Sequence, residues 1–502
     1  MKKMNLLVMS LVSAAALSFS SCSSNDDLTG GGAGNQSQVK GFYMTLAVQT
    51  PTSNGTRTSI GNSTEDATAV EAAVKSGTFY LVDSKGTVVF SKTLTATDWA
   101  GASGAIKDPA TAAKDGKTTL QIQVENVAAG ATYKVYFKAG STAMDGVTEP
   151  LAAGATGIFT ATGIEKTFTA GKAFDKTCAG DNNFSMFNQN DESRNGNGYT
   201  VTFEDGNKVA TNPAKVMYNN AESAIKIERV TARVDVPTSE TTLTTEELPS
   251  TASQALKNAV ADAKDKVSKI ELVSYALSNV TNKTYVMQTW IDKNLTIPEG
   301  VTLYQPKAAF GTKYLLDATC FKSYATATND YIFENNKTGE EATAMYFQYH
   351  VTLDGTKFEG TPDFEDGTFY RYNNVIYTSF AQIYKAYADV PGLFGGKTAD
   401  DMKTAAKTAS ATEADLAAFR ELYQIEVFKG GMTYYKQVIT DNQLGKDVIQ
   451  RNTIYRLNVN KIFNVGAQVP NGEIDKNGLF YLDVTVTVNP WVLNTQNVSL
   501  GD

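Results

Sequence analysis

Apolar and polar residues alternate with a period of two in segment after segment of this 502-residue chain. Near the start, Phe42, Met44, Leu46 and Val48 occupy every second position of one such segment. Near the end, the segment from 480 to 488 alternates just as strictly. A period of two places successive side chains on opposite faces of a β-strand, so each segment predicts a strand with one face on a core.

The segments between these two ends carry the same signal and are separated by short turn sequences. Closely spaced strands joined by turns are typical of β-sandwiches, whereas βαβ units would place a helix between strands. We predict a hairpin at 77–90 and strands at 118–124, 131–138, 199–203, 225–236, 270–279, 284–290, 343–353, 432–439 and 453–462.

Two segments have the helical period instead. Between 253 and 269, apolar residues recur every three or four positions, and a second helical region covers roughly 378–424, where Thr412 begins a sequence that resembles a capping box. The fold class that we expect is mainly β: two β-sandwich domains with a few helices, the second carrying this helical insertion. A Thr/Glu-rich link suggests the domain boundary, with an N-terminal domain at 58–236 and a C-terminal domain at 237–489.

The first 21 residues predict a signal peptide of the lipoprotein type. Two lysines precede an apolar run that ends in small residues before Cys22, a pattern that resembles a bacterial lipoprotein signal in which Cys22 is lipidated. A plain secretory signal is the alternative. Residues 22–57 would then be a propeptide made of a Gly/Ser/Asn-rich tether and the first strand. No later apolar run reaches the ~18 residues that a membrane span needs, so we expect attachment through lipid alone.

A polar turn segment follows the first strand and ends at Arg57. Its Pro, Ser, Asn and Gly residues predict an exposed loop that a protease can reach. Cleavage there would separate a core-forming strand from the rest of the core. The alternative is an ordinary N-terminal edge strand followed by a loop with an incidental arginine.

Composition and residue types exclude several classes of function. The net charge of -8 and the pI of about 5.1 argue against nucleic acid and acidic lipid surfaces as partners.

Once Cys22 is lipidated, Cys178 and Cys320 remain, far apart in sequence, and we expect two separate thiols rather than a disulfide.

We predict no enzyme, no cofactor and no metal site. The chain has one histidine, His350, and no G-x-S-x-G elbow accompanies it. The shortage of Cys and His argues against a zinc-type cluster. A glycosidase pair of carboxylates forms in space and not in sequence, so that class stays open. The segment 392–398 resembles a phosphate loop but has the wrong glycine spacing, so we expect a turn that joins two helices. The acidic segment 363–367 lacks the ligand pattern of a calcium loop, so we expect a solvated hairpin there.

Five further motifs occur in a characteristic order: IERVTARVDV, YIFENN, GGMTYYKQVI, RNTIYRLNVNKIFNVGAQVP and VTVNPWVLNTQNVSL. Together with the lipoprotein start and the strand before Arg57, they resemble the Bacteroidales major fimbrial subunits, the fimbrillins of type V pili. The resemblance covers nearly the whole chain. The helical insertion is less characteristic of that family.

The resemblance implies a precursor that is carried to the outer membrane by its lipid and then cut. An arginine-specific or trypsin-like protease would cleave the Arg57–Thr58 bond, and the first strand would leave. The C-terminal strand of an identical or related subunit would then fill the groove by β-strand addition and build a fimbrium. The expected donor is the tail 490–502, which begins at Pro490, where the ladder of the preceding strand should be interrupted. Its apolar residues are Trp491, Leu493, Val498 and Leu500.

Two alternatives remain open from the sequence. One is a tip or accessory fimbrial adhesin, in which the helical insertion binds a host or bacterial surface ligand. The other is a carbohydrate-binding or hydrolysing surface lipoprotein, in which tyrosines and Trp99, Trp290 and Trp491 line a glycan site.

Overall fold

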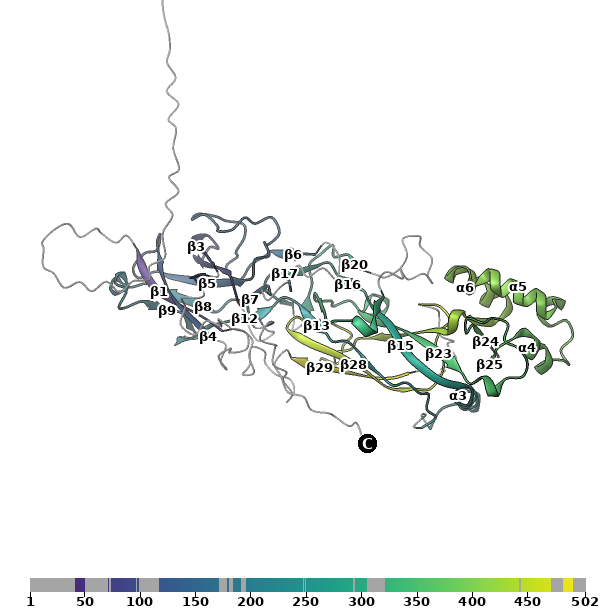
Figure 1. Ribbon diagram of the computed structural model, residues 1–502. Coiled ribbons are helices and arrows are strands. Elements are labelled where there is room, and N and C mark those ends of the chain that lie inside the picture. The colour runs from purple at the N-terminus through teal and green to yellow at the C-terminus, as the bar shows by residue number, and fades with distance from the viewer. Residues whose placement is uncertain are drawn as a thin grey trace, which may run out of the picture. The chain divides into compact units, whose positions relative to one another are not determined.

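The computed structural model describes most of the chain between residues 41 and 490 (Figure 1). Strands dominate these residues and helices are few, which confirms the mainly β fold class. Among the described residues, no helix is long and apolar enough to cross a membrane. The described ranges are 41–49, 71, 74–95, 97–98, 117–170, 178–179, 184–190, 196–246, 248, 250–291, 294–304, 321–441, 444–470 and 482–490.

The largest sheet is built from the N-terminal strands, in the order β11-β10-β8-β5-β7-β12-β1-β4. The predicted hairpin joins this sheet, because β2 pairs with both β3 and β5. The hairpin turn forms where the Asp83 carboxylate accepts the amide hydrogens of Lys85 and Thr87, both at 2.8 Å. The strands are β1 (Phe42–Gln49), β2 (Gly77–Val82), β3 (Val88–Leu94), β4 (Lys117–Val124), β5 (Thr132–Ala139), β7 (Met186–Asn188), β8 (Tyr199–Thr202), β9 (Ala214–Lys215), β10 (Met217–Tyr218), β11 (Ala221–Glu222) and β12 (Ile225–Arg229).

The long strand predicted at 225–236 is divided in two. β12 belongs to the large sheet, whereas β13 (Ala232–Val234) belongs to a second sheet and pairs there with β28 (Thr453–Ile462). The chain therefore passes from one sheet to the next at Val230 and Thr231, whose backbone groups bond to Ser185 and Asn452 instead of continuing a ladder. The division of the chain into two domains at Val236 stays a prediction.

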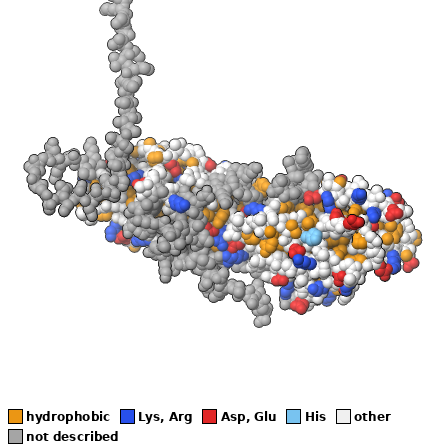
Figure 2. All heavy atoms as spheres, viewed as in Figure 1, with side chains coloured by type: hydrophobic (Ala, Val, Ile, Leu, Met, Phe, Trp, Pro, Cys, Tyr) orange, Lys and Arg blue, Asp and Glu red, His pale blue; other side chains and the backbone are white. Residues whose placement is uncertain are grey.

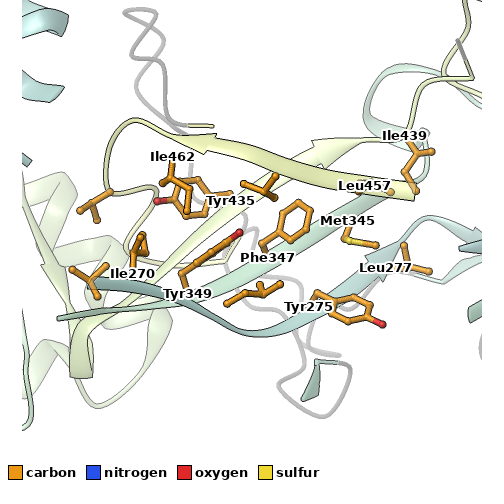
Figure 3. Close-up of a cluster of buried hydrophobic side chains, with 14 of the residues drawn as sticks. Ile270, Tyr275, Leu277, Met345, Phe347, Tyr349, Tyr435, Ile439, Leu457 and Ile462 are labelled. Atoms are coloured by element: carbon orange, nitrogen blue, oxygen red, sulfur yellow. The ribbon is translucent and has the colours of Figure 1, made fainter. Parts of the chain in front are cut away.

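The C-terminal part contains two more sheets that enclose a common core. One has the order β14-β28-β13-β22 with β29 added to β28, and the other has the order β21-β15-β23-β27. Figure 3 shows Leu457 and Ile462 facing Tyr275, Phe347 and Tyr349 across this core, which is the arrangement of a β-sandwich. The strands are β14 (Thr238–Ser239), β15 (Val267–Ser278), β21 (Lys322–Ser323), β22 (Asp330–Ile332), β23 (Ala344–Leu353), β27 (Met432–Val438) and β29 (Leu482–Pro490).

Short two-stranded pairs complete the β structure, and one of them corrects a prediction. The strand expected at 284–290 is two strands, because β17 pairs with β6 while β18 forms a hairpin with β19. Val286 and Met287 lie between these two strands and are buried. The pairs are β6 (Thr167–Thr169) with β17 (Lys283–Tyr285), β18 (Thr289–Ile291) with β19 (Asn294–Thr296), and β16 (Val280–Thr281) with β20 (Leu303–Tyr304).

The helices lie where the helical period predicts them. α3 (Gln254–Lys266) begins after Ser253, whose hydroxyl accepts the amide hydrogen of Leu256, and leads directly into β15. The predicted insertion contains α4 (Phe380–Ala386), α5 (Ala399–Ala409) and α6 (Glu413–Tyr423), set beside a small sheet of β24 (Phe369–Tyr372), β25 (Val375–Tyr377) and β26 (Ile425–Phe428).

The insertion also settles two details of the sequence reading. The phosphate-loop-like segment is the turn that joins α4 to α5, as expected, and its last residue, Thr398, caps α5. The Thr412 hydroxyl accepts the amide hydrogen of Asp415 and so caps α6, as the motif predicted.

Candidate functional site

β1 lies inside the large sheet, with partner strands on both sides. All eight of its residues pair antiparallel with β4, from Phe42 opposite Val124 to Gln49 opposite Lys117. On the other side β1 runs parallel to β9 and β12, with Val48 opposite Ile225. β1 is therefore an interior strand, and the alternative of an ordinary edge strand is wrong.

The apolar face of β1 is buried in the core of this sheet, as the alternation predicted. The exposed fractions of Phe42, Met44, Leu46 and Val48 are 8, 0, 1 and 1%. The Phe42 ring meets the Phe203 ring edge to face at 5.5 Å between centroids. Four buried side chains on one short strand make β1 a large contributor to the core.

The side chains of β4 complete the strip that covers β1. Val124 lies opposite Phe42, Ile122 opposite Met44, and Leu120 opposite Leu46. All of these belong to, or pack against, a single hydrophobic cluster. Cross-strand apolar pairs of this kind are the main source of side-chain stabilisation within a sheet.

A buried ionic cluster anchors the chain a short distance after the predicted cleavage point. Glu71 is 2% exposed, and both of its carboxylate oxygens accept hydrogen bonds from the Arg233 guanidinium at 3.1 Å. The Tyr331 hydroxyl donates to the same carboxylate at 2.8 Å, and the Arg229 Nε donates to the Glu71 backbone carbonyl at 2.9 Å. These partners come from β12, β13 and β22, so Glu71 is fixed at the junction of the two sheets.

Burial sets the protonation behaviour of this cluster. Burial lowers the pKa of Arg229 to about 9, although the neighbouring Glu71 carboxylate opposes that shift. Burial, followed by the charge of Glu71, raises the pKa of the Tyr331 hydroxyl above its ordinary value. At neutral pH the two guanidinium groups thus lie beside the Glu71 carboxylate and a neutral phenol, and Arg233 also pairs with the Asp235 carboxylate at 2.5 Å.

The C-terminal strand has the opposite kind of position. Among the described residues, β29 pairs with β28 alone, from Leu482 opposite Ile462 to Pro490 opposite Thr453. The strand thus runs two residues beyond the predicted end at Val488. Pro490 can occupy the last position because a proline lacks only the amide donor and keeps its carbonyl acceptor.

The structure brings together only part of the predicted site. The buried face of β1 is in place, whereas Cys22, Arg57, Thr58 and the apolar tail residues lie outside the described residues. Cys178 is buried, and Cys320 is likewise outside the described ranges, so the expectation of two separate thiols stays a prediction. The tail residues in question are Trp491, Leu493, Val498 and Leu500.

The sequence did not predict which strands lie on either side of β1, nor that Glu71 is buried. The alternation of β4 predicts a strand but does not say that its partner is β1. The parallel contact with β12 was also unpredicted, and so was the burial of Glu71, because its partner Arg233 comes from a distant segment. The basic residues inside the strand pattern of 225–236 were a usable signal, since a buried arginine needs an acidic partner.

The histidine and the acidic turn singled out in the sequence both lie among the described residues. His350 lies half-buried on β23, and no group of three His, Cys, Asp or Glu side chains that could hold a metal occurs among the described residues. The acidic turn at 363–367 is partly structural, because Asp363 accepts bonds from the Tyr370 hydroxyl and the Phe380 amide. On the face shown in Figure 2, acidic and basic side chains are interspersed, unlike the single basic patch of a nucleic-acid binder.

One hollow and one tryptophan among the described residues bear on the glycan-binding alternative. A hollow of about 370 Å³ lies beside Glu299, Lys337 and Glu341, and no aromatic side chain from the described residues lines it. Trp290 is half-buried and donates its indole hydrogen to the Asn190 carbonyl at 2.8 Å. The other two tryptophans lie in undescribed segments.

Comparison with known proteins gives a family for the C-terminal part. Residues 426–497 match the family model of the major fimbrial subunit protein type IV, fimbrillin, C-terminal region. A search of curated protein sequences returned no significant match. The matched segment includes β27, β28 and β29, and two of the motifs on which the sequence resemblance rests.

Similar solved structures include a fimbrilin from Porphyromonas gingivalis, with 14% identity and a TM-score of 0.41 over 91% of this chain and 100% of the other. A putative cell adhesion protein from Parabacteroides distasonis has 13% identity and a TM-score of 0.40 over 91% and 100% of the two chains. A second one from that organism has 12% identity and a TM-score of 0.42 over 90% and 100%.

The family match supports a structural role in a fimbria rather than an enzymatic one. The matched segment contains the motifs at 430–439 and 451–470. The resemblance to the fimbrillins is confirmed over residues 426–497, which match the C-terminal region of that family.

Proposed function

We propose that the protein is a structural subunit of a cell-surface fimbria that polymerises by exchange of its first strand. In this proposal it is exported as a lipoprotein through Cys22 and held at the outer membrane. An arginine-specific or trypsin-like protease then cuts the Arg57–Thr58 bond. The observation that carries the proposal is the interior position of β1, with its four buried side chains, in a strand whose last residue, Gln49, precedes Arg57 by eight positions.

Loss of β1 would open the sheet between β12 and β4, one strand in from its rim. Each of the four buried side chains stabilises the protein by about 1.5 to 3 kcal/mol, and their removal also leaves backbone groups of both neighbouring strands unpaired. Before cleavage, β1 holds the groove because it is part of the same chain and so has a high effective concentration. After cleavage it can diffuse away, and a strand from another subunit can replace it.

The replacing strand is proposed to be the C-terminal tail of a neighbouring subunit. The tail starts where β29 ends at Pro490, so it leaves from the rim of the second sheet. In an unbroken strand Trp491 and Leu493 would share one face and Val498 and Leu500 the other, so a bend or bulge would be needed to bury all four. Donation from each subunit to the next does not close on itself and therefore builds a fibre.

The first test is the N-terminal residue of the protein in material sheared from the cell surface, measured by mass spectrometry. A start at Thr58 is the expected result and means that β1 has been removed. A start at lipidated Cys22 would overturn strand removal and point to an anchored subunit.

Two variants test the two halves of the proposal separately. Arg57→Ala should leave uncut, lipidated monomers, because the protease loses its site. Truncation before Trp491 should give cut but unpolymerised protein. Fibres from either variant, seen by electron microscopy, would contradict the corresponding half.

A tip or accessory adhesin is the second candidate function, and the insertion favours it. α4, α5 and α6 share a hydrophobic cluster of their own with the small sheet β24-β25-β26, centred on Phe380, Met402 and Phe419. Deletion of this insertion should leave fibre assembly intact if it serves adhesion only. Loss of both assembly and adhesion would assign the insertion to the shaft.

A further inference from the structure

We propose that β1 and β4 form a single folding unit, so that β4 recognises the incoming strand and becomes ordered only as that strand binds. The proposal deepens the proposed function, on which it rests for the identity of the partner. That partner is an extended strand of a second copy of this chain or of a related subunit.

The ladders around β1 are very unequal. β1 makes eight consecutive pairs with β4 but two pairs with β12 and two with β9. Among the described residues, β1 is the only strand that pairs with β4, whereas β12 also pairs with β7. If β1 leaves, β12 therefore keeps a partner strand and β4 loses the whole of its described ladder.

The side chains of β4 depend on β1 in the same way. Ile122 and Val124 are 1 and 0% exposed, and their direct neighbours across the ladder are Met44 and Phe42. Outside the ladder, the Gln121 side chain bonds to the backbone carbonyl of Ala210, which is a contact at the strand's outer, polar face. A strand held mainly by one partner opens together with that partner.

The groove that β1 would vacate is therefore not rigid. Removal of β1 would leave β12 with its partner β7, whereas β4 and the two-residue strand β9 would lose their only described partner strand. The incoming strand must run antiparallel to β4 and offer apolar side chains at every second position, opposite Leu120, Ile122 and Val124. Binding would then be coupled to the folding of β4, and most of the backbone recognition would come from β4.

The first experiment uses the uncut full chain, so it does not depend on cleavage. Hydrogen exchange with mass spectrometry is followed at increasing, sub-denaturing concentrations of guanidinium chloride. We expect peptides from β1 and β4 to open together with the same denaturant dependence. The control is β3, which pairs with β2 alone among the described strands and does not pair with β1. Opening of β4 together with β3, or independently of β1, would overturn the proposal.

The second experiment uses the chain cut at Arg57 and freed of β1. Amides of β4 should exchange at least 100-fold faster than in the uncut chain, while those of β3 stay within a few-fold of their original rates. Retained protection of β4 would overturn the proposal and leave the proposed function standing. If β1 is not released after cutting, the proposed function fails instead, and the first experiment still decides the inference.

A matched pair of core variants links β4 to the retention of β1. Ile122 and Leu94 are both buried in the same cluster, but Ile122 lies opposite Met44 of β1 and Leu94 opposite Gly77 of β2. Ile122→Ala should speed the release of β1 after cutting at least tenfold relative to Leu94→Ala. Ile122→Val should give a smaller change in the same direction if the alanine variant does not fold. Equal release rates for the β4 and β3 variants would contradict the proposal.

Discussion

β1 and β29 have nearly the same sequence pattern and opposite places in their sheets. β1 has pairing strands on both sides, whereas among the described residues β29 pairs on one side only. Removal of an interior strand leaves two rows of unpaired backbone groups, while removal of a rim strand leaves one. Alternation of apolar and polar residues thus identifies a strand, but the number of strands that pair with it decides how many backbone groups its removal leaves unpaired.

The largest effect should come from alkaline pH, which tests whether the two regions unfold together. Tyr80 and Tyr136 are fully buried in the N-terminal part, and Tyr349 and Tyr370 in the C-terminal part, and burial raises the pKa of each hydroxyl. Above pH ~10 the unfolded chain loses these protons while the folded chain keeps them, so stability falls by about 1.4 kcal/mol per phenol for each further pH unit.

The lowered pKa of Arg229 acts in the opposite direction between pH 9 and its ordinary range, but it is one group against several. Tyrosinate absorbance should therefore rise cooperatively, together with loss of circular dichroism. Hydrogen exchange at the same pH shows whether β1 and β29 are lost in one step. A gradual, non-cooperative rise in absorbance would contradict the burial of these phenols.

The next effect concerns the ion pair that fixes the start of β28, the strand that holds β29. Arg451 and Glu334 are 2 and 1% exposed and 2.7 Å apart, and Arg451 also donates to the carbonyl of Val286. Arg451→Met should lower the free energy of unfolding by about 3 to 5 kcal/mol, because Glu334 is left as a buried, uncompensated charge. Chemical denaturation measures this.

A matched control for that variant is Lys385→Met, since the Lys385–Glu359 pair is exposed. It should change stability little. If β29 depends on this ion pair and β1 does not, Arg451→Met should speed amide hydrogen exchange more in β29 than in β1. Equal increases in both strands would contradict that difference.

Proline substitutions compare the two strands directly. Met44 and Thr45 have register partners on both sides, in β4 and in β9, so proline at either position should cost about 3 kcal/mol or more. In a strand with one partner, alternate amides point away from the ladder. Of Thr485→Pro and Val486→Pro, one should therefore be tolerated much better than the other. Equal, severe losses at both β29 positions would show that β29 has a second partner.

The smallest effect provides a reference remote from both strands. The Thr398 hydroxyl accepts the amide hydrogen of Asp401 at 3.1 Å and caps α5 in the insertion. Thr398→Ala should lower stability by about 1 kcal/mol. Exchange in β1 and β29 should be unchanged, and a change in either would mean that the insertion supports the strand in question.

Most strands and helices could be predicted from the sequence, but the pairing of strands within each sheet could not. The alternation of Phe42 to Val48 specifies one buried face, but pairing depends on strands that follow much later in the chain. At the break the apolar positions change from odd (225 and 227) to even (230, 232, 234 and 236), and this shift by one residue was the signal that a single-strand prediction overlooked. Glu71 could not be placed from its own segment, because it stands among small apolar residues, and the partners that make its burial favourable, Arg233 and Tyr331, lie far away in the sequence.

The Glu71 anchor has a consequence for proteolytic trimming. Lys75 is exposed and is the next basic residue after Arg57, so basicity alone would allow a trypsin-like enzyme to continue to Lys75. A protease needs an extended, detachable segment in its cleft. The stretch from 71 to 77 is tied at one end by the Glu71 contacts and at the other by the first pair of β2, Gly77 with Leu94. In the proposed cleaved form, we expect this double attachment to slow further trimming at Lys75.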